Sequence, residues 1–186
     1  MRGIAFFVAA MLAAAPLQMA RADDIEVRDV ALRTVGEGMV LDADFAFELT
    51  PRLAEVVANG VPLYFRVDFE LTRSRWYWFD ETAASRRMHL RLSYHPLSRQ
   101  YRLSTGALQQ SFPSLEEALD VLKRVRNWLV VDRGVRLDAD YDAAVRMRLD
   151  TTLLPKPFQL SALTGRDLQL DSPWKRFIVR PQGKPR

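Results

Sequence analysis

The stretch from residue 63 to residue 71 alternates apolar and polar side chains without interruption. Every second position is apolar, and these positions are Leu63, Phe65, Val67, Phe69 and Leu71. Successive side chains of a β-strand point to opposite faces, so this pattern predicts one strand with a buried face and a solvent-facing face. Such a strand needs neighbours on both edges and a second layer over its apolar side, which the rest of the chain is expected to supply.

The same period of two recurs on both sides of this strand. Residues 24–35 and 39–49 predict a hairpin that turns at Gly36-Glu37-Gly38, with a change of phase near Arg28-Asp29 that indicates a β-bulge. Residues 86–94 and 101–105 predict a second hairpin. Further strands are expected at 128–131, 143–149 and 174–179.

Two segments carry helix signals instead. Thr50 and Pro51 supply an N-cap and a first-turn proline for a short helix that ends before Gly60. Ser114 and Glu117 form a capping box, after which apolar residues recur at three- and four-residue spacing. The apolar stripe of this amphipathic helix consists of Leu115, Ala118, Leu119, Leu122 and Val125, and Lys123, Arg124 and Arg126 are expected in its last turn.

The segment 153–167 contains Pro155 and Pro157, which remove backbone donors, and it is expected to be an extended, non-helical run along the surface or an edge. Together these patterns predict a mainly β fold, β-rich α+β in class. We expect an antiparallel β-sandwich or a strongly bent sheet, with one amphipathic helix and one short helix packed on it.

The amino terminus has the three parts of a secretory signal peptide. Arg2 gives a positive head, residues 4–15 are apolar, and Ala20-Arg21-Ala22 ends the segment with small residues. The apolar run of about twelve residues is too short to cross a bilayer, which needs ~20. We therefore expect cleavage after Ala22 and no transmembrane span afterwards. The predicted organisation is a signal peptide at 1–22, a single β-rich domain at 23–180 and a disordered tail at 181–186.

Charge and cysteine content narrow the choice of compartment and partner. The full chain has a net charge of +4, but Arg2 and Arg21 leave with the signal peptide, so 25 basic and 23 acidic residues remain and the mature charge is +2. A net charge this small does not favour binding to nucleic acid, so no nucleic-acid partner is expected. The absence of cysteine means that export brings no disulfides, so stability must come from packing. These features predict a soluble periplasmic protein of a Gram-negative bacterium.

The chain offers little for catalysis. Its two histidines, His89 and His95, have no second ligand at metal-binding spacing, and neither a nucleophile elbow nor a phosphate-cradling glycine loop occurs. We therefore expect no catalytic, cofactor-binding or metal-binding residues, and we expect that the protein is not an enzyme.

Two surface features remain as candidates. The first is an aromatic and basic cluster that consists of Arg73, Arg75, Trp76, Tyr77, Trp78 and Phe79. Arginine and tryptophan are enriched at interface hot spots, so this cluster is the candidate interaction surface. The alternative is that the rings close one end of the sandwich and the arginines lie over them.

The second feature is a set of arginines at solvent-facing strand positions, namely Arg87, Arg91, Arg146 and Arg148. They form a basic patch if they lie together. Alternatively they pair across strands with the carboxylates at equivalent positions, which are Asp42, Asp44, Glu48, Asp68 and Glu70. The order of the strands decides between the two.

Four stretches carry a family resemblance. They are RWYWFDE at 75–81, SYHPLSRQYRLSTG at 93–106, SFPSLEEALDVL at 111–122 and RMRLDTTLLPKPFQL at 146–160. In this order and spacing they resemble a family of exported proteobacterial proteins known as a domain of unknown function. The resemblance implies export, one β-rich domain and genes often beside those of a nitrogen-regulation-type sensor histidine kinase. It implies no catalytic residues.

The leading hypothesis is a non-enzymatic periplasmic binding or interaction module of the cell envelope, with an envelope protein or sensor as its partner. The alternative is a carrier of an apolar ligand or lipid within the sandwich, with Trp76 and Trp78 near its mouth. No cofactor is expected, and the oligomeric state stays open.

Overall fold

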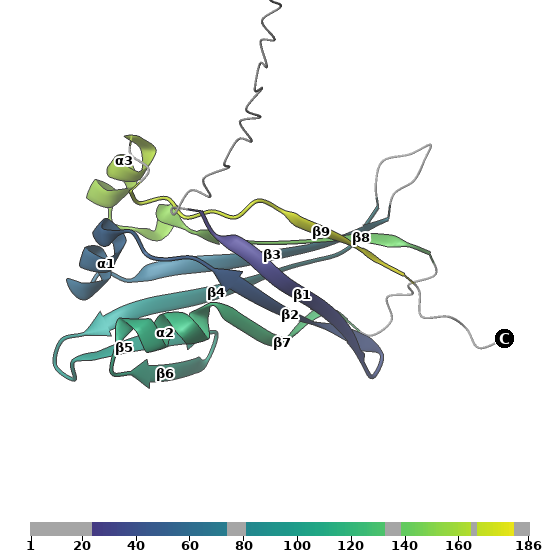
Figure 1. Cartoon of the computed structure of the whole chain (residues 1–186), viewed down its shortest axis with the longest axis horizontal. Helices are drawn as coiled ribbons and strands as arrows, with labels where there is room; N and C mark the ends of the chain where they lie inside the picture. The colour runs from purple at the N-terminus through teal and green to yellow at the C-terminus, as the bar shows by residue number, and fades with distance from the viewer. Residues whose placement is uncertain (1–23, 74–80, 133–138, 165–166, 181–186) are drawn as a thin grey trace, which may run out of the picture.

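The computed structural model describes residues 24–73, 81–132, 139–164 and 167–180. The predicted signal peptide at 1–22 and the predicted tail at 181–186 lie outside these residues. Two antiparallel sheets make up most of the described chain, so the predicted mainly β fold is confirmed (Figure 1).

The smaller sheet has three strands in the order β1-β2-β7, which are β1 (Glu26–Val35), β2 (Gly38–Ala46) and β7 (Arg124–Val131). The larger sheet has six strands in the order β6-β5-β4-β3-β8-β9. In that order they are β6 (Leu108–Phe112), β5 (Gln100–Thr105), β4 (Glu81–His95), β3 (Leu63–Arg73), β8 (Tyr141–Leu149) and β9 (Lys175–Val179).

The alternating stretch is strand β3, and it lies between β4 and β8 in the larger sheet. The five apolar residues predicted to be buried have 0% of their surface exposed. Val67 lies opposite Met88 on one side and Met147 on the other, so the three central strands share one apolar face. The neighbours and the covering layer that the pattern required are therefore both present.

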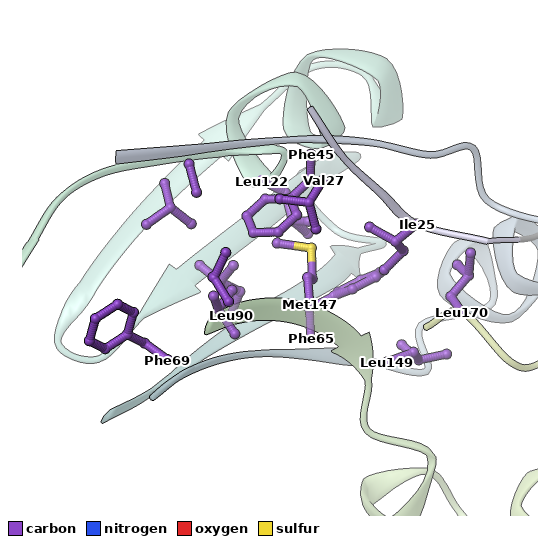
Figure 2. Close-up of a cluster of buried hydrophobic side chains, with 14 of the residues drawn as sticks. Ile25, Val27, Phe45, Phe65, Phe69, Leu90, Leu122, Met147, Leu149 and Leu170 are labelled. Carbon is purple, nitrogen blue, oxygen red and sulfur yellow. The ribbon is translucent and has the colours of Figure 1, made fainter. Parts of the chain in front are cut away.

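A single hydrophobic core joins the two sheets. Figure 2 shows Val27 and Phe45 of the smaller sheet pointing toward Leu90 and Met147 of the larger one. The ring of Phe65 stacks on that of Phe47, which follows β2, with 5.5 Å between the ring centres.

Both predicted hairpins are confirmed. β1 and β2 pair around a turn at Gly36, whose φ of +60° is a conformation that glycine adopts without strain. Their register shifts between Val27 and Asp29, where the bulge was predicted. β4 and β5 pair from Leu90 to His95, after which the chain turns.

Both predicted helices are present, although the second is shorter than expected. Thr50 caps α1 (Pro51–Ala58), and the Ser114 hydroxyl accepts a hydrogen bond from the Glu117 amide at the start of α2 (Leu115–Leu122). The extension of the stripe to Val125 was wrong. Val125 lies in β7 opposite Ala43 of β2, because strand pairing there buries its side chain and satisfies its backbone.

The basic residues predicted for the last turn of α2 lie elsewhere. Lys123 is the C-cap, while Arg124 and Arg126 belong to β7. The helix stripe and the strand pattern overlap in this segment, since a residue three positions after Leu122 fits both periods.

The prediction of an extended segment at 153–167 was also wrong. A short 3₁₀ helix, η1 (Thr151–Leu153), precedes the helix α3 (Lys156–Thr164). Pro155 lies just before α3, where its carbonyl accepts from the Phe158 amide (2.9 Å), and Pro157 lies in the first turn. Proline is tolerated there because first-turn amides have no partner within the helix.

Strand β6 has no counterpart in the sequence prediction. Its first four residues are exposed, so no period-two burial marks it. It pairs with β5 from Leu108 opposite Thr105 to Phe112 opposite Tyr101, and backbone hydrogen bonds at the sheet edge define it. The helices α1, α2 and α3 lie toward the left end of the sandwich in Figure 1.

Candidate functional site

The outer face of the larger sheet, turned away from the core, gathers arginines from three neighbouring strands. Arg87 of β4 and Arg146 of β8 lie directly opposite Asp68 of β3, one on each side. Two residues along, Arg66 of β3 lies opposite Arg148 of β8. We call Arg66, Arg87, Arg146 and Arg148 the arginine cluster.

All four guanidinium groups contact the same carboxylate. The Nε atoms of Arg66 and Arg87 lie 3.2 and 3.6 Å from Asp68 Oδ1, and those of Arg146 and Arg148 lie 3.1 and 3.4 Å from Oδ2. Asp68 is 5% exposed and is the only acidic residue among the buried ones in the described part of the chain. The cluster is therefore organised around one buried negative charge.

The nearest approach to Asp68 is made by Nε in every case. The Nε atom of Arg146 donates a hydrogen bond to Oδ2 (3.1 Å), whereas the Nε atom of Arg66 is buried without a hydrogen-bond partner in the described part of the chain. In the described part of the chain, Arg66 Nη1 contacts a second carboxylate, that of Asp150, at 3.6 Å. Among the described residues, Arg87, Arg146 and Arg148 form no ion pair with a carboxylate other than that of Asp68. A guanidinium has five N–H donors, so one carboxylate cannot satisfy the donors of all four arginines.

Aromatic rings support the edges of the cluster. The guanidinium of Arg146 lies over the Trp174 ring, 4.3 Å from its centre, just before β9. One row beyond Arg66, Arg91 lies 5.9 Å from the centre of the Tyr64 ring. Cation–π contacts of this kind restrict the arginine side chains without neutralising them.

The electrostatic balance of the site is positive. The ion pairs join four guanidiniums to two carboxylates, those of Asp68 and Asp150, which leaves an excess of two positive charges. Further charges on this face include the carboxylates of Glu70 and Asp171 and the guanidiniums of Arg91 and Arg176, two of each sign. Desolvation raises the pKa of the Asp171 carboxyl above its ordinary value of 3.8, while Arg146 lowers it and Asp24 raises it.

The smaller sheet shows the ordinary alternative, in which each carboxylate has its own arginine. Arg33 pairs with Asp42 at 2.7 Å, and Arg126 pairs with Asp44. The Asn127 amide donates to Asp42 (2.8 Å) and, together with the arginines, holds the pKa of that carboxyl below 3.8 against some desolvation. Only the larger sheet therefore shows a surplus of arginine around an acidic residue within the described chain.

This geometry answers the question that the sequence left open. Cross-strand pairing with Asp68 is real for Arg87, Arg146 and Arg148, but the three lie together and also form a patch. Arg91 lies beside the patch, over Tyr64. The sequence pattern does not place Arg66 in the patch, because Arg66 shares its strand with Asp68 and belongs to the alternation that predicts β3.

The structure describes only one residue of the predicted aromatic and basic cluster. Arg73 is the last residue of β3 and is half-buried. Arg75, Trp76, Tyr77, Trp78 and Phe79 lie outside the described residues, so both interpretations of the aromatic and basic cluster remain predictions.

The histidines lie apart from any ligand set. His89 is exposed on β4, and His95 accepts a hydrogen bond from the Ser98 amide (3.3 Å) in the turn between β4 and β5. Within residues 24–73, 81–132, 139–164 and 167–180, no group of three or more metal-ligating side chains is present. No helix in the same ranges is long and apolar enough to cross a membrane.

A groove of about 1190 Å³ lies where the ends of β1 and β2 meet α2 and β7. Its lining includes acidic residues such as Asp24 and Glu48 and basic residues such as Lys123 and Arg124. Apolar ligands are generally held by mostly hydrophobic walls. This groove therefore does not favour the hypothesis of an apolar ligand carrier.

Two packed antiparallel sheets with a basic outer face define a β-rich protein whose clearest surface feature is an arginine cluster. The sequence matches the family described as Domain of unknown function (DUF4390) over residues 22–178, and the chain belongs to that family. Comparison with curated proteins gave no match, and comparison with solved structures gave none either.

Proposed function

We propose that the protein is an exported, non-enzymatic binding module of the bacterial cell envelope that recognises an anionic partner through the arginine cluster. The observation that carries this proposal is the convergence of four guanidiniums on the single buried carboxylate of Asp68. An envelope protein or sensor with an acidic surface is one anionic partner that this face suits.

The arrangement exceeds what sheet stability needs. One opposite charge across a ladder contributes roughly 0.2 to 1 kcal/mol, and a second or third arginine on the same carboxylate also meets repulsion from the first. Placing four together costs stability unless a further anion compensates them. Surplus positive charge on a solvent-facing surface is the expected form of a site that gains its counter-charge from a partner.

Export is supported by the amino-terminal sequence. The positive head, the short apolar run and the small residues before Asp23 fit a cleaved secretory signal, and the chain contains no cysteine. An antibody against the chain should detect a product shortened by about 22 residues in the periplasmic fraction, as the signal-peptide pattern predicts.

The binding proposal is tested by site-specific photocrosslinking in cells. A photoreactive residue at Ser85 or Glu70, both exposed on the arginine face, is expected to capture a discrete partner. The same residue at Leu97, which is 93% exposed in the turn between β4 and β5, serves as the positional control.

The captured product should depend on the cluster itself. Arg87→Gln with Arg146→Gln is expected to abolish the adduct, and higher salt should weaken it because exposed charges are screened. The matched control is Arg33→Gln with Arg126→Gln, which removes two arginines from the smaller sheet. An adduct that survives the first double variant, or is lost equally in the control, would contradict the proposal.

A further inference from the structure

We infer that the arginine cluster binds the phosphate group of a small phosphorylated ligand. The inference rests on the proposed function, since it specifies the chemistry that the same cluster recognises. It goes further because it names a ligand class and a binding mode for individual atoms.

The first argument is the accessibility of the donors. The Nε atom of Arg146 donates to Asp68, and the side chains of Arg87, Arg146 and Arg148 are partly exposed, so their guanidiniums are accessible to a ligand from solvent. A guanidinium presents paired N–H groups that match two oxygens of a phosphate or carboxylate. Three guanidiniums held around one carboxylate supply more donors than a carboxylate ligand can accept, whereas a phosphate offers several oxygens.

The second argument is charge. The ion-paired groups have an excess of two positive charges, because four arginines face Asp68 and Asp150. A phosphomonoester has a charge of about −1.5 to −2 at neutral pH. A single such group therefore neutralises the cluster, which a lone carboxylate would leave partly uncompensated.

The third argument is size. Adjacent strands lie about 4.8 Å apart and same-face residues of one strand about 6.7 Å apart. Arg87 and Arg146 are two strand spacings apart, and Arg66 and Arg148 lie one same-face step along. The four residues cover a compact area suited to one phosphate group and its surrounding donors, rather than the long track that an extended acidic peptide follows.

The fourth argument is rigidity. Arg66 is held between Asp68 and Asp150, and Arg146 is held between Asp68 and the Trp174 ring. Arginines fixed before the ligand arrives lose less side-chain entropy on binding. Asp68 and Trp174 are thus positioning residues for the cluster.

Titration calorimetry on the chain that starts at Asp23 tests the inference at constant ionic strength. Inorganic phosphate and glycerol 1-phosphate are expected to bind, and acetate is expected to bind at least about tenfold more weakly. Arg146→Gln with Arg148→Gln should weaken phosphate binding by about tenfold or more. Arg33→Gln with Arg126→Gln should leave it unchanged.

Arg148→Lys tests whether the paired N–H donors of the guanidinium are needed, because lysine keeps the positive charge but lacks the paired donors. Phosphate affinity is expected to fall in this variant although the net charge is constant. Circular dichroism and urea unfolding establish that each variant is folded before titration. Equal affinity for acetate and phosphate, or an unaltered affinity in the Arg146 and Arg148 double variant, would overturn the inference.

Vesicle flotation separates two sources of the phosphate group. Phosphatidylcholine vesicles with and without phosphatidic acid are compared with glycerol 1-phosphate in solution. Binding to the soluble ester supports the small-ligand form, while retention only on phosphatidic acid overturns it in favour of a lipid headgroup. If no phosphate compound binds but the crosslinked partner still depends on Arg87 and Arg146, the inference fails and the proposed function stands.

Discussion

At the scale of single residues, Asp68 is the side chain on which the outer face depends. Its backbone continues the alternation of β3, yet its side chain is nearly as buried as the apolar residues beside it. A buried carboxylate is tolerated when it is paired, and here four arginines pair with it. The same contacts that make Asp68 tolerable hold the arginines in place.

Asp68→Asn is expected to lower the free energy of unfolding by about 3 kcal/mol, at the low end for loss of one partner from a buried ion pair. The low end applies because the arginines are partly exposed, with 18% of the Arg66 side chain and 67% of the Arg87 side chain accessible. Urea unfolding measures the effect. Added salt should restore part of the loss, since it screens repulsion among the four arginines.

Glu55→Gln is the comparison for Asp68→Asn. Glu55 pairs with Arg52 at 2.8 Å on the exposed surface of α1. An exposed ion pair of this kind contributes about 1 kcal/mol or less to the free energy of unfolding. A similar loss in both variants would show that Asp68 has no special role.

At the scale of elements, the helix starts show how one short signal can act locally or link distant segments. Ser114 accepts from the Glu117 amide (3.2 Å) and donates to the Glu117 carboxylate (3.4 Å), so both of its bonds stay within the first turn of α2. Thr50 caps α1 through the Leu53 amide and also donates its hydroxyl to the Asp167 carbonyl at 2.6 Å, so it connects residues 117 positions apart. The sequence predicts both N-caps, but it does not predict the hydrogen bond from Thr50 to the Asp167 carbonyl.

Thr50→Ala is expected to cost about 2 kcal/mol, because it removes the cap and leaves a carbonyl without its donor. Ser114→Ala is expected to cost about 1 kcal/mol, because only local bonds to Glu117 at the helix start are lost. Thr50→Ser keeps both hydrogen bonds and should recover most of the difference. Thermal and urea unfolding of the three variants provide the comparison, and equal losses in the two alanine variants would argue against the second role of Thr50.

At the scale of the whole molecule, the two sheets share one core rather than two. The core includes residues of β1 and β2 on one side and of β3, β4 and β8 on the other, together with residues of all three α-helices. Phe65 lies at its centre, fully buried and stacked on Phe47. A core of this kind makes the sheets depend on each other for stability.

Phe65→Ala is expected to lower the free energy of unfolding by about 4 kcal/mol, since it leaves a cavity between the sheets. Unfolding should remain one transition when followed by far-ultraviolet circular dichroism and by tryptophan fluorescence, because neither sheet keeps a core of its own. Ile178→Ala, at a position 62% exposed, should change stability by less than about 0.5 kcal/mol. Two separate transitions in the Phe65 variant would contradict a shared core.

The sequence by itself determined which positions of most strands are buried. The alternation from Leu63 to Leu71 has a period that depends only on local backbone geometry, so it can be recognised without knowing which strands lie beside it. The same holds for the bulge near Arg28-Asp29 and for the two N-caps. These features come from neighbours a few residues apart.

The sequence was less informative where burial did not alternate or where two local rules competed. Strand β6 is an exposed edge strand that only its backbone pairing with β5 defines. Helix α3 begins next to prolines, which are unfavourable inside a helix but tolerated in its first turn. The end of α2 fits both a helix stripe and a strand, and pairing of β7 with β2 decides it.

Only the tertiary structure decided the site. Arg146 is 78 positions from Asp68 in the chain, and the two meet because β8 pairs with β3 while β4 brings Arg87 to the other side. Strand order depends on how all the apolar faces pack together, and no local period encodes it. The sequence therefore supplied the arginines and the carboxylate, and the fold assembled them into a cluster with surplus positive charge.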